Sequence, residues 1–186
     1  MRVTILFGVL TAIAVTQAPA LRITFTPESP QFEAAASEYT DLWAREGERI
    51  VKTMESVSGL TFDGNDVQAI VFEGVSESGY RARPMRLRAS YPPDTKKATL
   101  IHELGHRLES DLFRKGEDDH PYLFLWIYDV WVKLYGRQFA DEQVAVEKAR
   151  RGVYPAAWDT AMARAASLIR RRPQPITSTG RGYLMR

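Results

Sequence analysis

Two of the three histidines in this 186-residue chain stand four positions apart, and a glutamate directly follows the first. The stretch reads LIHELGHRL, residues 100–108, and its chemically active members are His102, Glu103 and His106. On a helix, side chains at positions i and i+4 lie one turn apart on the same face, so both imidazoles can reach one ion. Glu103 leaves the helix about 100° away from His102, beside such an ion rather than on it. The spacing therefore predicts a metal site with its own proton acceptor.

The rest of the composition limits what the ion can be. The chain has no cysteine, which excludes disulfides, a thiol nucleophile and thiolate ligands. Imidazole, carboxylate and water remain, and Zn²⁺ accepts two imidazoles and a carboxylate while leaving one position open. Leu100, Ile101, Leu104 and Leu108 form the apolar face expected of a core helix. Gly105 is expected to keep the helix narrow on a side that faces substrate.

The motif resembles that of the zinc metallopeptidases called zincins. Thr99 stands where these enzymes often carry threonine or valine, and uncharged residues flank His102. Arg107 departs from their consensus, which has an uncharged residue there, and we expect its side chain to point to solvent. Glu109 and Leu112 occupy positions where the metzincin branch needs glycine and histidine, so that branch is excluded. Glu109 itself is expected in solvent or as an outer partner of the site. The likeness in sequence covers about a dozen residues.

The order of the expected elements extends the likeness to a very small gluzincin, in which the third ligand is a glutamate on a later helix. The resemblance therefore directs the search to the helix expected over residues 137–152. Glu147 lies deep in this helix, and we favour it as the third ligand. Glu142 is the alternative, although acidic residues in first helical turns also simply complement the helix dipole. His120 is a further alternative, in an acidic segment that we expect to be an exposed loop.

The resemblance implies metal-assisted hydrolysis of a peptide or protein substrate. Zinc would polarise the scissile carbonyl and acidify a water, while Glu103 takes its proton and passes it to the leaving amine. Tyr154 is the candidate for stabilising the oxyanion, a role that zincins often give to tyrosine or histidine. The strand expected over residues 84–90 is an edge on which an extended peptide could pair. Two other classes stay open: a zinc-binding protein without proteolytic activity, and a degenerate, zinc-free interaction domain.

Hydrophobic periodicity and turn residues predict the elements that position these side chains. We expect strands over 21–27, 66–74 and 84–91, and helices over 29–59, 92–116, 122–136, 137–152 and 155–173. The fold class is therefore α+β: a zincin-like domain over residues 21–172, with a small mixed sheet packed on the motif helix and a helical C-terminal half. Residues 173–186 form a tail.

The first twenty residues have the composition of a targeting segment. A positive start at Arg2 is followed by a charge-free apolar run, and Ala18 and Ala20 form an A-x-A-type cleavage site. We expect residues 1–20 to be a signal peptide, and the protein to be secreted or periplasmic. If the segment stays uncleaved, it is an N-terminal membrane anchor, the one membrane association expected. A net charge of +2 gives no reason to expect nucleic-acid binding, and we expect a monomer.

Overall fold

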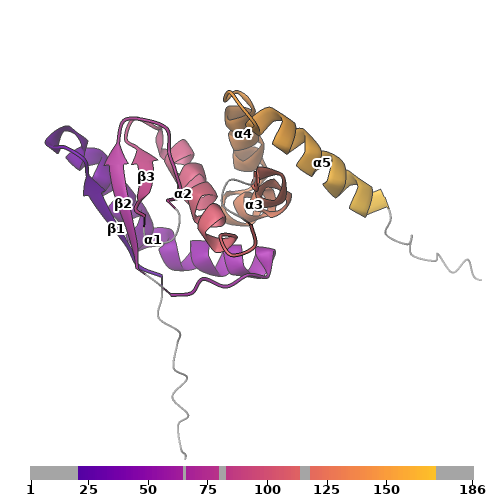
Figure 1. Cartoon of the computed structure of the whole chain (residues 1–186), viewed down its shortest axis with the longest axis horizontal. Coiled ribbons are helices and arrows are strands. Elements are labelled where there is room, and N and C mark those ends of the chain that lie inside the picture. Colours follow the sequence, from indigo (N-terminus) through magenta and orange to yellow (C-terminus); the bar gives the residue numbers. More distant parts are fainter. Residues whose placement is uncertain (1–20, 65, 80–82, 114–117, 171–186) are drawn as a thin grey trace, which may run out of the picture.

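The computed structural model describes residues 21–64, 66–79, 83–113 and 118–170. The predicted signal peptide, residues 1–20, and the predicted tail, residues 173–186, lie outside the described residues. Within the described ranges, none of the helices combines the length and apolar character needed to cross a membrane. The chain is α+β, as expected, with a small sheet followed by a mostly helical second half (Figure 1).

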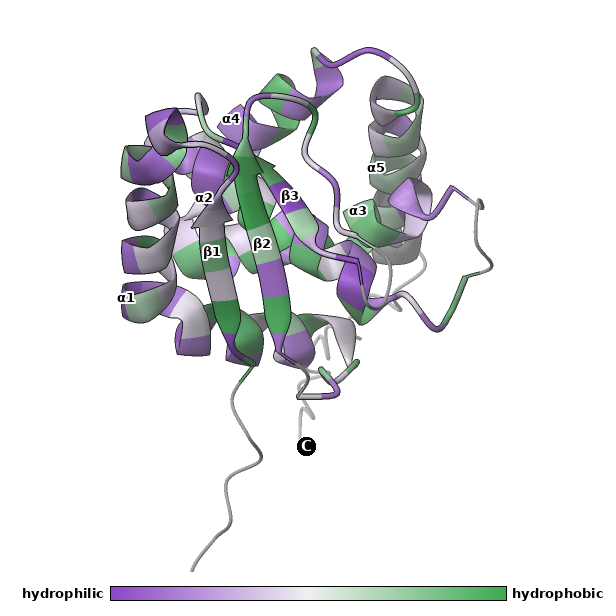
Figure 2. Cartoon of the chain, turned by 60° about the vertical axis from the view of Figure 1, so that its left-hand side comes forward, coloured by the Kyte–Doolittle hydropathy of each residue, from purple (hydrophilic) through white to green (hydrophobic). Residues whose placement is uncertain are grey.

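A three-stranded sheet of order β1-β2-β3 forms one side of the molecule. The strands are β1 (Ile23–Pro27), β2 (Val67–Phe72) and β3 (Met85–Arg88). Both strand pairs are parallel, so the prediction of a mixed sheet was wrong for these strands. The helix between β1 and β2 returns the chain to the same end of the sheet, and parallel pairing requires such a crossover. Figure 2 shows the central strand, β2, as mostly hydrophobic, and alternate residues of β2 are buried.

The crossover helix packs along the sheet. A 3-10 turn, η1 (Pro30–Phe32), leads into α1 (Glu33–Ser58), which ends at Gly59 with a left-handed φ of 75°. Ser29 starts the turn but makes no side-chain capping bond. The buried face of α1, which includes Tyr39, Ile50 and Met54, contacts β1 and also α3. Helix α1 thus joins the sheet to the helical half.

The motif helix, α2 (Pro93–Leu108), lies between the sheet and the later helices (Figure 1). It begins at Pro93, and its N-cap residue, Pro92, offers no side-chain hydrogen bond. It was predicted to run to Gly116 but ends at Leu108. At Glu109 the chain leaves the helix, and its buried carboxylate accepts a 2.6 Å hydrogen bond from the Trp126 indole. Glu109 is thus the C-cap residue of α2, and its side chain is buried.

Three further helices complete the fold: α3 (His120–Tyr135), α4 (Arg137–Lys148) and α5 (Tyr154–Arg170). Gly136, with a φ of 89°, separates α3 from α4. Phe124 of α3 stacks on Trp158 of α5 at 4.1 Å between ring centroids, and Trp131 packs against the same indole. Aromatic rings therefore form much of the contact between α3 and α5.

Gly105 allows α2 and α3 to approach closely. A Cβ atom at this position would lie 2.4 Å from the Cδ1 atom of Leu123 and 3.3 Å from the ring of Trp126. The expectation that Gly105 faces substrate was therefore wrong, because the glycine faces α3. The close approach brings the first turn of α3 against the two motif histidines.

We expect Gly105→Ala to lower the free energy of unfolding by about 1–3 kcal/mol, because the added methyl overpacks the α2–α3 contact. At an uncrowded position inside a helix, the same change raises the free energy of unfolding by about 1 kcal/mol. The sign of the change in free energy therefore tests whether the α2–α3 contact is close. Urea unfolding of metal-free protein measures the effect, with Ser56→Ala on the exposed face of α1 as control. The double variant Gly105→Ala/Leu123→Ala should lose less stability than the sum of the single changes. An unchanged or increased stability of Gly105→Ala would contradict the close approach.

Candidate metal centre

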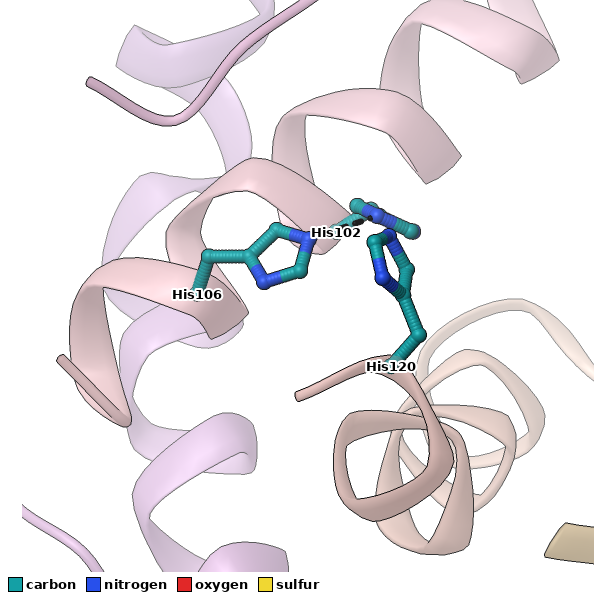
Figure 3. A group of neighbouring side chains, drawn as sticks. All are labelled: His102, His106 and His120. Atoms are coloured by element: carbon teal, nitrogen blue, oxygen red, sulfur yellow. Dashed lines mark hydrogen bonds between the residues drawn. The ribbon is translucent and has the colours of Figure 1, made fainter. Parts of the chain in front are cut away.

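Three imidazoles meet where α2 faces the start of α3 (Figure 3). His102 and His106 come from α2, and their Nε2 atoms lie 3.0 Å apart. His120 is the first residue of α3. The centroid of its ring lies 5.4 Å from the ring centroid of His102 and 4.7 Å from that of His106. One nitrogen from each ring lies within 4.8 Å of the others. Nitrogens on a tetrahedral zinc ion at about 2.0–2.1 Å stand about 3.3 Å apart, so this group could hold a metal ion.

His106 and His120 each have their second ring nitrogen held by a carboxylate. The Nδ1 of His106 lies 2.8 Å from Oδ2 of Asp119, and the Nδ1 of His120 lies 2.7 Å from Oδ1 of Asp118. A carboxylate on Nδ1 favours the tautomer that keeps the lone pair of Nε2 for an ion. The Nε2 of His120 is buried and has no hydrogen-bond partner among the described residues. An unpartnered imidazole nitrogen that faces two others fits a bound cation.

Glu147 lies behind His102 rather than among the three imidazoles. Its Oε1 is 2.8 Å from the Nδ1 of His102, a close contact although neither atom meets the alignment of a hydrogen bond. Its Oε2 accepts a 2.8 Å bond from the Trp158 indole, and the carboxylate is 2% exposed. The Nε2 of His102 faces His106, so Glu147 contacts the opposite ring nitrogen. The structure thus places Glu147 as a support of His102, not in the position expected of a third ligand.

The two alternatives to Glu147 fall in different places. Glu142 is exposed on α4 and accepts a 2.9 Å hydrogen bond from Gln138. His120 was expected in an exposed loop, and this was wrong: it starts α3 and its side chain is 17% exposed. Pro121 could have indicated this helix start, because proline is common in the first turn of a helix.

Burial and charge set the protonation of the three imidazoles in opposite directions. Burial lowers the pKa of His102 to about 4, against the charge of Glu147. Burial also lowers the pKa of His120, as does the charge of His106. For His106, burial is outweighed by the hydrogen bond to Asp119 and nearby carboxylate charge, which raise its pKa. His102 is therefore neutral near pH 7, the form in which an imidazole binds a metal.

Glu103 and Tyr154 adjoin the same centre. Glu103 follows His102 on α2 and is 3% exposed, and burial raises its pKa to about 7. Tyr154, the first residue of α5, stacks on His102 with ring centroids 5.7 Å apart and lies 4.8 Å from the ring of His120. The structure thus brings both predicted catalytic side chains next to the histidines.

The outer edge of β3 was expected to be free to pair with a peptide. In the structure, part of this edge is already paired. Glu77, from the connection between β2 and β3, pairs with Arg86 through two backbone hydrogen bonds of 2.8 and 2.9 Å in antiparallel sense. The backbone N–H of Arg88 donates to Oγ of Ser76 at 3.1 Å. The chain itself therefore occupies this edge.

The side chain of Arg107 links the motif helix to the connection between β2 and β3. Its Nη1 donates to the carbonyls of Ser78 at 2.7 Å, Gly79 at 3.0 Å and Arg83 at 3.3 Å. The expectation that Arg107 points to solvent was wrong, because backbone carbonyls attract its guanidinium.

Arg107 also lines a cavity of about 500 Å³ with Phe62, and none of the three histidines lines that cavity.

Comparison with models of protein families, with curated proteins and with solved structures finds no match to this chain.

We expect His102→Ala, His106→Ala and His120→Ala each to remove bound zinc, because each deletes one of three convergent nitrogens. Glu147→Gln should keep stoichiometric zinc but weaken its affinity about 10- to 100-fold, as loss of a carboxylate behind a ligand does. Glu142→Gln is the matched control on the same helix and should change nothing. Zinc content after dialysis and competition with a chelator measure both effects. Full zinc affinity in His120→Ala, with loss in Glu147→Gln, would show that Glu147 is the ligand after all.

We also expect Glu109→Gln to stabilise the metal-free protein at alkaline pH. Glu109 is 4% exposed, its Oε2 is buried and has no hydrogen-bond partner among the described residues, and burial raises the pKa of the carboxyl from 4.5 to about 7. Because the folded pKa is the higher one, ionisation of Glu109 destabilises the fold as pH rises from about 4.5 to 7. Glutamine keeps the acceptor for Trp126 without the charge, so the variant should gain ~1–3 kcal/mol at pH 8. Thermal unfolding across this range should show the gain shrinking towards pH 4.5; a gain independent of pH would contradict the assignment.

Proposed function

We propose that this protein is a zinc-dependent metallopeptidase of the zincin type, with His102, His106 and His120 as the metal ligands and Glu103 as the general base. The observation that carries the proposal is the convergence of His120 on the HExxH pair. The spacing within the motif accounts for two nitrogens on one helical face, but not for a third from another helix. Three imidazoles with a buried glutamate beside them are typical of a catalytic zinc site, which keeps one position open for water or substrate.

Zinc, when bound, supplies a Lewis acid that polarises a carbonyl and acidifies a water. The residues of the chain then divide the remaining work. Glu103 accepts a proton from the attacking water and delivers it to the leaving amine, since its buried carboxylate lies within electrostatic reach of His106. Tyr154 would donate its hydroxyl hydrogen to the oxygen of the attacked carbonyl, a role supported by the stacking of its ring on His102. The carboxylates behind the imidazoles keep Nε2 directed at the ion.

A zinc-binding protein without proteolytic activity is the second candidate. The pairing of Glu77 with Arg86 favours it, because the chain itself uses the β3 edge on which a peptide was expected. The retained Glu103 favours hydrolysis, because a structural zinc site needs no buried base.

Glu103→Gln separates the two candidates. The amide keeps the shape of the side chain but cannot accept the proton, so zinc content should be unchanged while hydrolysis falls by about two to four orders of magnitude. Cleavage of a denatured, fluorescently labelled protein is the assay, with the exposed Glu142→Gln as the control that should retain full activity. If zinc-loaded wild-type protein cleaves no faster than Glu103→Gln, the metallopeptidase proposal is wrong and the non-proteolytic candidate stands.

A further inference from the structure

Arg150 brings a positive charge to the side of the candidate centre. It follows the end of α4, and its guanidinium is half-buried. Its Nη2 makes one long contact, 3.5 Å, with Oγ1 of Thr99 on α2. The Cζ atom lies 5.6 Å from the ring centroid of Tyr91 and 5.3 Å from that of Tyr154. In the described part of the chain no carboxylate is within ion-pair distance of it.

Arg150 donates a side-chain hydrogen bond to the Tyr154 hydroxyl, and the charges of Glu147 and Glu103 attract it, although neither carboxylate forms an ion pair with it in the described part of the chain. The two tyrosine rings stabilise a cation through their faces but carry no charge to neutralise it. The oxygens of Glu147 are directed at His102 and Trp158 rather than at the guanidinium. A guanidinium has five N–H donors, and its best partner is a planar carboxylate bound through two parallel hydrogen bonds. The contacts with Thr99 and Tyr154 use only part of these five donors, so the guanidinium can still bind an anion from outside the chain.

The contact with Thr99 locates that anion relative to the base. Thr99 and Glu103 stand four residues apart on α2, so they lie on one face about 6 Å apart along the axis. An extended peptide advances about 3.3 Å per residue. A carboxylate on Arg150 would thus lie one or two residues from a carbonyl positioned beside Glu103. Tyr154 connects the two places, because its ring contacts both the guanidinium and His102.

We propose that Arg150 binds a carboxylate of the substrate one or two residues from the cleaved bond, so that the substrate class is a peptide with an acidic group at that distance. This inference rests on the proposed peptidase function. The carboxylate has two sources, the C-terminal carboxylate of the peptide or the side chain of an acidic residue. The first makes the protein an enzyme that removes one or two C-terminal residues, and the second makes it one that cleaves near Asp or Glu.

Binding of matched peptides to the zinc-loaded full chain carrying Glu103→Gln tests the inference, since this variant should not consume them. One pair is N-acetylated tetra-alanine with a free carboxylate and the same peptide as its C-terminal amide. The other pair is acetyl-Ala-Glu-Ala-Ala-amide and its glutamine analogue. Isothermal titration should show the charged member of one pair binding at least about tenfold more tightly, as expected for a charge-assisted, bidentate contact. The pair that shows the preference identifies the source of the carboxylate.

Adding Arg150→Gln should abolish the preference, and Arg150→Lys should reduce it to a few-fold, because lysine keeps the charge but not the bidentate geometry. Arg151→Gln is the matched control, an exposed neighbour that should leave the preference intact. Equal affinity within both pairs, or a preference that survives Arg150→Gln, overturns the inference. So does a preference lost on removing zinc, because the carboxylate would then bind the ion itself. A wild-type protein that cleaves no peptide overturns the proposed function but leaves these affinities standing.

Discussion

The close packing of α2 on α3 at Gly105 is the constraint on which the rest of the site depends. Because no side chain separates the helices there, Leu123 and the ring of Trp126 lie directly against the motif helix. His120 is one turn before Leu123 on α3, so the same packing delivers its imidazole to the other two. The stacking of α3 on α5 then fixes Tyr154 over the histidines. A single small residue thus determines which side chains share the centre.

Two carboxylates near the histidines are buried and need hydrogen-bond donors. Glu109 and Glu147 are both nearly inaccessible, and each accepts a hydrogen bond from a tryptophan, Trp126 and Trp158 respectively. An indole N–H is a donor on an otherwise apolar ring, so it satisfies a carboxylate oxygen without adding a second polar group that needs a partner. The aromatic residues of α3 and α5 therefore both pack the core and hold the carboxylates that flank the histidines.

The sequence predicted the elements well, because apolar periodicity and the Gly and Pro residues between segments are local signals. The relation of His102 to His106 was equally accessible, since helix geometry alone determines it. Two features of the site were not: the position of His120 beside the two motif histidines, and the position of Glu147 behind His102. Both depend on how helices pack, which periodicity does not encode. Arg107 was misjudged for the same reason, because its carbonyl partners belong to a segment far away in the sequence.

The three histidines also have a topological consequence. An ion bound by His106 and His120 would close a loop over residues 107–119. It would add a link between two helices that packing and the contacts of His106 with Asp119 and of Trp126 with Glu109 already hold together. Restricting such a loop in the unfolded chain is how a disulfide stabilises a fold, and this chain has no cysteine. A metal ion in this position would serve as a reversible cross-link, so that folding of this half and metal supply become linked equilibria.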